Sequence, residues 1–307
     1  MRMVNRMQEG SFAPRAVALE TTLLVHGLPP DRSKVLAADL NRIIRAEGAE
    51  PALIGIVAGA ATIGLNDAEL DMLLRAAAES PSAVPKANTA NLGVLMHWGS
   101  HAATTVSTTM ELAATAGIRV FATGGLGGVH RNYGCDLDVS SDLAAFTRWP
   151  VAVVSAGVKG VLDVEATREV LETLGVTVVG FRTDVFPAFY RRESRARVDA
   201  RFDEVIDLAA FLRSEFERIG ATGGPRGILI CNPVPPEHEV PAAEWDRWLD
   251  QAEDAAEQAG ISGRDLTPFM LARLHEISGG QTVATNIELV KHNARLAAKL
   301  ASAMARL

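Results

Sequence analysis

The alternation of short apolar runs with helical stretches constrains the fold of this 307-residue chain more than any other feature. Aliphatic runs of the kind that form buried strands occupy residues 16–19, 52–58 and 151–157. Stretches with apolar residues at helical spacing lie at 33–49, between the first two runs, and at 162–175, after the third. A strand, a helix and a second strand within about thirty residues form a βαβ unit. The sequence therefore predicts a single-domain, three-layer α/β/α fold with a largely parallel central sheet.

The two ends of the chain differ in character. Residues 1–14 lack the apolar core of a signal peptide, so we expect a flexible N-terminal extension followed by one domain over 15–307. The stretch 51–65 is too short to span a bilayer and is predicted as buried sheet. The last third of the chain is predicted to be mainly helical, with one strand at 226–234. Its helices are predicted over 202–219, 241–260, 265–277 and 287–305.

Charge and cysteine content exclude several classes of protein. The net charge of −7 argues against a nucleic-acid partner, so an anionic substrate must be held by a local cluster of positive groups. Cys135 and Cys231 lie far apart in the sequence and are predicted to be free thiols in a reducing cytoplasm. We expect a cytoplasmic protein with no membrane partner.

A glycine cluster in "FATGGLGGVHR" (121–131) ends an apolar run. A dinucleotide-binding loop needs G-x-G-x-x-G between a strand and a helix. Gly125 and Gly127 match, but His130 stands at the third position and no helix follows directly. A turn that lets a ligand approach the backbone and a plain strand-to-loop turn remain open.

Two aspartates, Asp138 and Asp142, follow this cluster at a spacing of four residues. Aspartates at a helix start are usually caps. Here they come after a strand end, a glycine turn and a histidine. One of them could bind a hard divalent ion such as Mg²⁺ or Mn²⁺ while the other orients substrate hydroxyls.

Two further ionisable residues end apolar strands, where active sites of parallel sheets lie. Lys159 in "VVSAGVKG" is placed where partial burial favours the neutral amine, a nucleophile that forms a Schiff base with an aldehyde. The alternative is a lysine that reaches past the strand end to solvent. Glu20 in "VALETT" is placed where burial favours a protonated carboxylic acid, suited to general acid or base catalysis.

Two weaker candidates concern an anion. Lys86 in "VPKANT" is a plausible phosphate contact, although most loop lysines are merely solvated. The segment 104–106 opens a predicted helix, where free backbone N–H groups bind anions. An ordinary N-cap is the favoured alternative there.

Taken together, ordered blocks of the sequence resemble the pseudouridine-5'-phosphate glycosidase family, also called indigoidine synthase A-like. They cover the chain from about residue 15 onward and include "ALETTLLVHGLP", "ATTVSTTM", "FATGGLGGVHR", "VVSAGVKGVLD", "CNPVPPE" and "TNIELVKHNARLAA". The family splits the C–C glycosidic bond of pseudouridine 5'-phosphate into uracil and ribose 5-phosphate with Mn²⁺, and its members form homotrimers.

This resemblance also implies roles for individual residues. Lys159 would carry C1' of the ring-opened ribose as an imine, Glu20 would be the general acid, and Asp138 would bind Mn²⁺ (or Mg²⁺). An iminium at C1' is the electron sink that a C-glycoside needs, and in reverse it is an electrophile for an aromatic carbon. The substrate contacts implied by the family are Lys86, Thr105, Val106, His130, Ser140, Ser141, Asp142 and Asn286.

Two blocks depart from the family pattern. "KANTANLG" stands where the family resembles K-V-S-R-R-D-L, and "HGLPPDRSKV" stands where it shows M-P-Y-P-x-N. This pattern resembles the alnumycin-type C-glycosynthase branch. We therefore expect a C-glycosynthase that joins C1' of ribose 5-phosphate to an aromatic, polyketide-type acceptor through a lysine imine.

Other functions stay open at this point. The main alternative is the glycosidase that releases uracil. A non-catalytic sugar-phosphate binder is a remote alternative. A ribokinase-like kinase would need a phosphate-donor loop, which we do not find in the sequence, and would give Lys159 no role.

Overall fold

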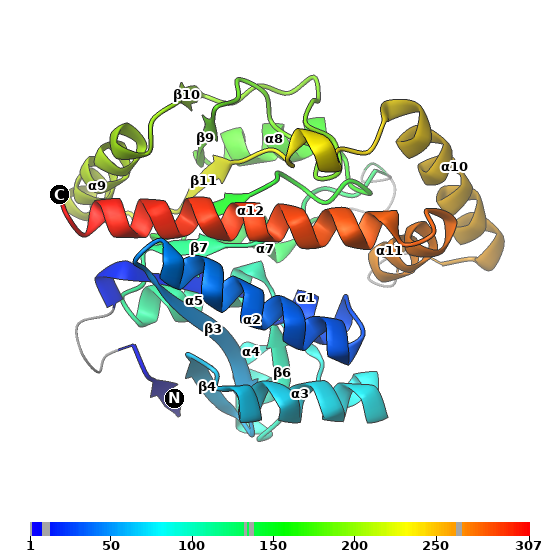
Figure 1. Cartoon of the computed structure of the whole chain (residues 1–307), viewed down its shortest axis with the longest axis horizontal. Helices are drawn as coiled ribbons and strands as arrows, with labels where there is room; N and C mark the ends of the chain where they lie inside the picture. The colour runs from blue at the N-terminus through cyan, green and yellow to red at the C-terminus, as the bar shows by residue number, and fades with distance from the viewer. Residues whose placement is uncertain (1, 8–12, 132–133, 135–137, 262–265) are drawn as a thin grey trace.

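The computed structural model describes the chain except residues 1, 8–12, 132–133, 135–137 and 262–265. A central sheet is covered by helices on both faces (Figure 1). Helices α2 (Pro30–Ala46), α9 (Val205–Thr222) and α12 (Gln281–Met304) cover one face. Helices α5 (Val106–Thr115), α7 (Ser141–Ala145) and α8 (Val164–Thr173) cover the other. The predicted three-layer α/β/α architecture is confirmed.

The sheet is built mainly from parallel pairs, as predicted. Its strands follow the order β1, β4, β3, β2, β7, β8, β11, β9, β10, and all pairs from β3 to β10 are parallel. Strands β4 and β6 (Ala102–Thr104) run antiparallel to β3, and β5 (Lys86–Ala87) pairs with β6. The strands are β1 (Met3–Asn5), β2 (Ala16–Leu19), β3 (Glu50–Val57), β4 (Ala60–Ile63), β7 (Val120–Ala122), β8 (Ala152–Ser155), β9 (Thr177–Phe181), β10 (Ala200–Phe202) and β11 (Ile228–Cys231).

The remaining helices lie at the edges of this arrangement. They are α1 (Thr22–His26), α3 (Asp67–Glu79), α4 (Leu92–His97), α10 (Ala242–Ala259) and α11 (Leu266–Ile277), with 3₁₀ turns η1 (Ala13–Arg15), η2 (Pro81–Ala83) and η3 (Pro236–His238). Gly279 and Gly280 adopt φ of 59° and 90° between α11 and α12, which separates the two helices. None of the described helices is long and apolar enough to cross a bilayer.

The predicted buried sheet over 51–65 is a β-hairpin of β3 and β4. Ala58 and Gly59 form its turn with φ of 48° and 72°, a conformation that favours glycine. A Cβ on Gly59 would also lie 2.6 Å from the Met96 carbonyl oxygen. The hairpin therefore depends on glycine at this position.

The N-terminal segment differs from its prediction. Strand β1 pairs with β4, with Met3 opposite Ala61. Arg6 donates to the Gly64 carbonyl at 3.0 Å and to both carboxylate oxygens of Glu69 at 3.0 and 2.9 Å. Residues 3–6 are therefore bound to the sheet edge, which corrects the expectation of a flexible extension for this part of residues 1–14.

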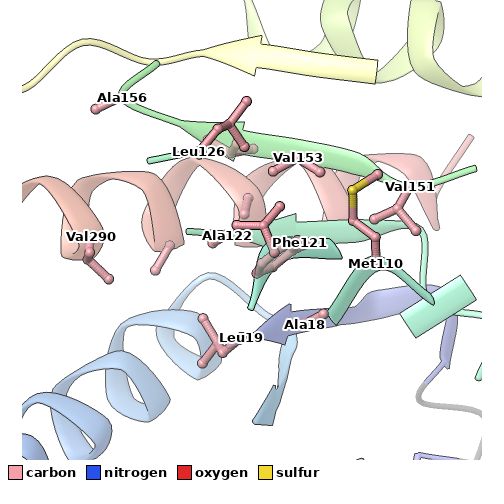
Figure 2. Packing of buried hydrophobic residues seen from close by; sticks show 14 of the residues in the cluster. Ala18, Leu19, Met110, Phe121, Ala122, Leu126, Val151, Val153, Ala156 and Val290 are labelled. Carbon is pink, nitrogen blue, oxygen red and sulfur yellow. The ribbon is translucent and has the colours of Figure 1, made fainter. Parts of the chain in front are cut away.

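The core lies between the sheet and its two helical layers. Ala18, Phe121 and Val153 come from neighbouring strands and are fully buried, and Val290 of α12 faces the same sheet (Figure 2). Because both faces of these strands are covered, their sequences are continuously apolar rather than alternating. Polar side chains that function must therefore follow the strands, at their C-terminal ends.

Candidate active site

The site is positioned by three adjacent parallel strands. Glu20 follows β2 and Thr123 follows β7. The pairing of β7 with β8 continues beyond both strands, because Leu126 N donates to Gly157 O at 2.9 Å and Lys159 N donates to Leu126 O at 3.0 Å. Parallel strands end at one edge of a sheet. The structure thus places Glu20 and Lys159 at the same edge.

Glu20 is the centre of a group of charges that influence one another. Burial raises its pKa above the ordinary value, and the Asp142 carboxylate raises it further. The Lys159 ammonium, the Thr123 hydroxyl and the more weakly acting Lys86 ammonium oppose this rise. The Thr123 hydroxyl donates a hydrogen bond to Glu20 Oε1. A carboxyl group whose protonated form is favoured therefore lies beside a primary amine.

Lys86 belongs to the same group of interacting charges. Desolvation by the surrounding chain lowers its pKa although the side chain reaches solvent, and the nearby Lys159 ammonium lowers it further. It lies on β5, whose partner β6 leads directly into α5. Two lysines thus flank Glu20 and supply the local positive charge that an acidic protein needs to hold an anion.

Asp142 takes the anion-binding position predicted at the start of α5. Its side chain is buried, and its two oxygens accept from Ser107 N at 2.9 Å and Gly127 N at 2.8 Å. Thr105 is the N-cap of α5 without a side-chain cap hydrogen bond, and Val106 is buried behind it. The protein's own carboxylate therefore fills part of this helix terminus, which limits the predicted role of residues 104–106 as a free anion site.

The short helix α7 begins where the sequence predicted substrate contacts. Ser140 is its N-cap and accepts from Asp142 N at 3.2 Å. Ser141 Oγ lies 3.2 Å from Ser107 Oγ, which joins the starts of α7 and α5. The predicted residues at 140–142 therefore lie together around the aspartate that bonds both segments.

The glycine cluster makes room for the protein's own side chains. A Cβ on Gly125 would lie 2.4 Å from the Phe189 ring, one on Gly127 would lie 2.3 Å from Ser140 Oγ, and one on Gly128 would lie 2.4 Å from Thr167 Oγ1. At these three positions neighbouring side chains fill the space that a Cβ would take, so the glycines are needed for packing within the protein.

His130 and Asp138 form a separate pair. His130 Nε2 lies 3.4 Å from Asp138 Oδ2 and 3.2 Å from Thr267 Oγ1, and His130 N donates to Asp138 O at 3.1 Å. Within the described part of the chain, no hydrogen bond or ion pair joins this pair to Glu20 or Lys159. Of the two cysteines predicted to be free thiols, Cys231 is a buried free thiol, and Cys135 lies outside the described residues.

A metal site in this region would have few protein ligands. The described residues contain no group of three or more His, Cys, Asp or Glu side chains that could hold a metal ion. Asp138 is only partly buried, so water has access to its carboxylate. One carboxylate completed by water suits Mg²⁺ or Mn²⁺, and Asp138 fits that arrangement.

Asn286 presents an unused acceptor. It lies on α12, and its Oδ1 is buried without a hydrogen-bond partner among the described residues. A Cβ on Gly124 would lie 3.0 Å from this oxygen, so Asn286 lies against the first glycine of the cluster. An acceptor in this state fits the predicted contact with a ligand, because buried polar groups normally find a partner.

Three polar residues that support Glu20 were not predicted from the sequence. The Thr123 hydroxyl donates to Glu20, Asn293 donates to the Thr123 carbonyl, and Asn232 donates to Asn293. Thr123 and Asn232 each directly follow a buried strand, the same signal that identified Glu20. Asn293 interrupts the buried face of α12, which is the one sequence signal for it.

Known proteins match nearly the whole chain. The model of the family described as indigoidine synthase A like protein matches residues 11–303. A protein named pseudouridine-5'-phosphate glycosidase from Symbiobacterium thermophilum is 45% identical over 94% of this chain and 92% of its own length. One of the same name from Methylobacterium nodulans is 46% identical over 94% of this chain and 83% of its own.

Two solved structures share the fold. An indigoidine synthase A-like protein from Thermotoga maritima has a TM-score of 0.85 and 34% identity, over 98% of this chain and 96% of that one. The prealnumycin C-glycosynthase AlnA, solved in complex with ribulose 5-phosphate, has a TM-score of 0.88 and 33% identity, over 100% of this chain and 98% of that one.

These matches confirm the resemblance drawn from the sequence motifs, and the names of the relatives confirm the expectation of an enzyme for C–C glycosidic bonds. They give better support to cleavage, which was the alternative, than to the bond formation that we expected first. With the match over residues 11–303, the chain belongs to the indigoidine synthase A-like family.

Proposed function

We propose that the protein cleaves the C–C glycosidic bond of pseudouridine 5'-phosphate to give uracil and ribose 5-phosphate. The observation that carries the proposal is the placement of the Glu20 carboxyl and the Lys159 side chain at one sheet edge, in mutual electrostatic contact. The names of relatives at 43–46% identity support the same substrate. A carboxylic acid and an amine are the two groups that this reaction requires.

The proposed reaction begins with opening of the ribose ring. Glu20, whose pKa burial raises, donates a proton to the ring oxygen as its bond to C1' breaks. The Lys159 nitrogen then adds to C1' through its lone pair and forms a C–N bond. Glu20 is left as a carboxylate and can take up the proton that the attacking nitrogen loses.

Bond cleavage follows from the new nitrogen at C1'. Its lone pair forms the C=N bond of an imine, while the electron pair of the C1'–C5 bond passes to the uracil carbon. That carbon takes the proton that Glu20 accepted from the nitrogen, which gives uracil. Water then hydrolyses the imine to ribose 5-phosphate and the free amine of Lys159, so the balance is one water consumed for one bond cleaved.

Other residues of the site hold the substrate in this proposal. Lys86 is the phosphate contact, because it brings a positive charge beside Lys159 and Glu20. Asn286 offers its unpaired Oδ1 to an N–H group of the uracil. His130 contacts the same substrate, and Asp138 beside it would hold Mn²⁺ or Mg²⁺. The metal supplies positive charge that neutralises anionic oxygens of the substrate.

The proposal is tested by incubation with Mn²⁺ and pseudouridine 5'-phosphate, with uracil followed by chromatography. Wild type should release uracil, and Lys159→Ala should not. Borohydride reduction in the presence of ribose 5-phosphate should add the sugar mass to the peptide that carries Lys159. Lys159→Arg is the matched control, because it keeps the charge without the nucleophile. A label on another residue, or none, would show that the mechanism is wrong.

Bond formation to an aromatic acceptor is the second candidate, and one feature favours it. The segment after Lys86 replaces a family pattern with two arginines by a neutral turn, in which Asn88 N donates to Asn91 Oδ1 at 2.8 Å and Asn91 Nδ2 donates to Lys86 O at 3.0 Å. AlnA, a C-glycosynthase by name, shares the fold over the full chain. No uracil release together with intact imine formation would favour this synthase.

Assembly and location belong to the same proposal. The family resemblance supports a homotrimer, and the two cysteines expected as free thiols support the cytoplasm. Light scattering of the purified protein would test the trimer.

A further inference from the structure

A line of hydrogen bonds runs through the core to the Glu20 carboxyl. Asn232 Nδ2 donates to Asn293 Oδ1 at 2.9 Å. Asn293 Nδ2 in turn donates to the Thr123 carbonyl at 2.8 Å and to the Gly124 carbonyl at 3.4 Å. The Thr123 hydroxyl completes the line by donating to Glu20 Oε1. Strand β11, helix α12 and strand β7 are thus connected to one acidic side chain.

The amides in this line are placed where apolar residues would normally pack. Asn293 and Asn232 are 0% and 2% exposed, and the neighbouring buried positions of α12 are aliphatic, among them Leu289 and Ala297. Burying an amide is costly unless its groups are hydrogen-bonded. Here the Asn232 amide donates to Asn293, and the Asn293 amide donates to the backbone of Thr123, whose hydroxyl contacts Glu20, so the two asparagines do more than fill space.

The backbone that they hold is the last segment of β7 before the glycine cluster. Thr123 N already donates to Val154 O at 3.0 Å, and Gly124 O accepts from Ala156 N at 2.9 Å. Asn293 adds a bond from the helix side, so the peptide between Thr123 and Gly124 is fixed from both the sheet and α12. The direction of the Thr123 hydroxyl depends on this backbone.

We propose that Asn293, itself held by Asn232, is a positioning residue for Glu20. It fixes the Thr123 backbone so that the Thr123 hydroxyl orients the carboxyl group toward the substrate. This inference rests on the proposed function, because it assigns Asn293 a part in the proton transfer by Glu20. A general acid must be held within hydrogen-bond reach of its target, and small misplacement is costly.

The test compares Asn293→Ala with Ser302→Ala in uracil release. Ser302 is a matched control, because it is also buried on α12 and its hydroxyl donates to Glu47 O at 2.7 Å, far along the helix from Thr123. In Asn293→Ala we expect kcat to fall about 10- to 100-fold with KM unchanged. In Ser302→Ala we expect a loss of thermal stability with kcat unchanged.

The pH profile separates positioning from a general loss of stability. The Thr123 hydrogen bond lowers the pKa of Glu20, so loosening it should move the Glu20 limb of the profile to higher pH. Thr123→Val should shift the limb the same way, and the double variant with Asn293→Ala should lose little more. If Asn293→Ala does not fold, Asn232→Ala gives the test, with a smaller loss in the same direction. A wild-type kcat and pH profile in a destabilised variant would overturn the proposal.

Titration of the Glu20 carboxyl tests the positioning role independently of enzymatic activity. The ¹³C NMR signal of the Glu20 carboxyl, assigned with Glu20→Gln, is followed against pH in wild type and Asn293→Ala. If wild type releases no uracil and forms no imine, the proposed function fails, yet the Glu20 titration should still move to higher pH in Asn293→Ala. An unchanged titration would overturn the positioning role whatever the activity.

Discussion

Replacement of Asp142 by asparagine should destabilise the protein strongly for so conservative a change. The aspartate is 4% exposed and accepts one backbone N–H from Ser107 and another from Gly127. Asparagine has the same shape but a single acceptor oxygen. Its NH₂ group would face one of the two N–H donors, so one hydrogen bond is lost and one buried N–H is left unpaired.

The magnitude follows from these two bonds. A hydrogen bond to a charged group contributes about 1.5–3 kcal/mol, and an unpaired buried donor costs about 1–3 kcal/mol. Because the two figures describe overlapping parts of one change, we expect a decrease of about 3 kcal/mol in the free energy of unfolding. For a domain of this size that lowers Tm by about 5 °C. Urea unfolding and differential scanning calorimetry without substrate measure both quantities.

Asp163→Asn is the matched control. Asp163 is the N-cap of α8 and accepts a single bond, from Ala166 N at 2.9 Å. Asparagine caps a helix about as well as aspartate, so this variant should stay within about 0.5 kcal/mol of wild type. The reasoning is refuted if Asp142→Asn is as stable as Asp163→Asn.

Asp142→Asn should also change the pH dependence of activity. The Asp142 carboxylate raises the pKa of Glu20, so removing its charge lowers that pKa toward the ordinary value. Glu20 then loses its proton at a lower pH than in wild type. The high-pH limb of the kcat profile should move to lower pH, opposite to the shift expected for Thr123→Val.

Three further predictions concern single positions. In Glu20→Gln, kcat should fall by about 10²–10⁴. Burial raises the pKa of Glu20, so its stabilising contribution is full below the ordinary value of 4.5 and is lost as pH rises through the raised folded value. Unfolding of Glu20→Gln should therefore depend less on pH than that of wild type. Gly125→Ala should destabilise by about 1–3 kcal/mol in urea unfolding, because its Cβ would meet the Phe189 ring. Gly220→Ala in α9, with nothing within 4 Å, should not. Asp138→Asn should lose its stimulation by Mn²⁺ in a chelated and reloaded enzyme; full stimulation would exclude Asp138 as ligand.

Much of the fold could be predicted from the sequence, because the local spacing of apolar residues decides which segments form helices and which form strands. The run 16–19 coincides with β2, and the predicted helix 241–260 agrees with α10 (Ala242–Ala259). Apolar runs too short for helices have to be strands, and strands buried on both faces belong to a parallel sheet. The strand-end rule also found Glu20 and Lys159 at one sheet edge without knowledge of the tertiary structure.

What the sequence did not reveal depends on contacts between distant segments. Residues 3–6 (MVNR) are too few to indicate a strand by themselves, and only pairing with the edge of β4 makes residues 3–5 a strand. The sequence does not show that Phe189, Ser140 and Thr167 pack against the glycine cluster, where each occupies the position that a Cβ would take. Spacing along a chain cannot predict such packing, because the partners come from separate elements.

The site divides in the same way. The sequence by itself determined which groups are available: an amine and a carboxyl group, each of which follows a buried strand. Only the tertiary structure decided their state, because burial and the surrounding charges act through space and raise the pKa of Glu20. It also brought Asn293, 170 residues away in sequence, to the Thr123 carbonyl. The types of reactive side chain thus follow from the local sequence, whereas the orientation and charge state of those side chains depend on tertiary packing.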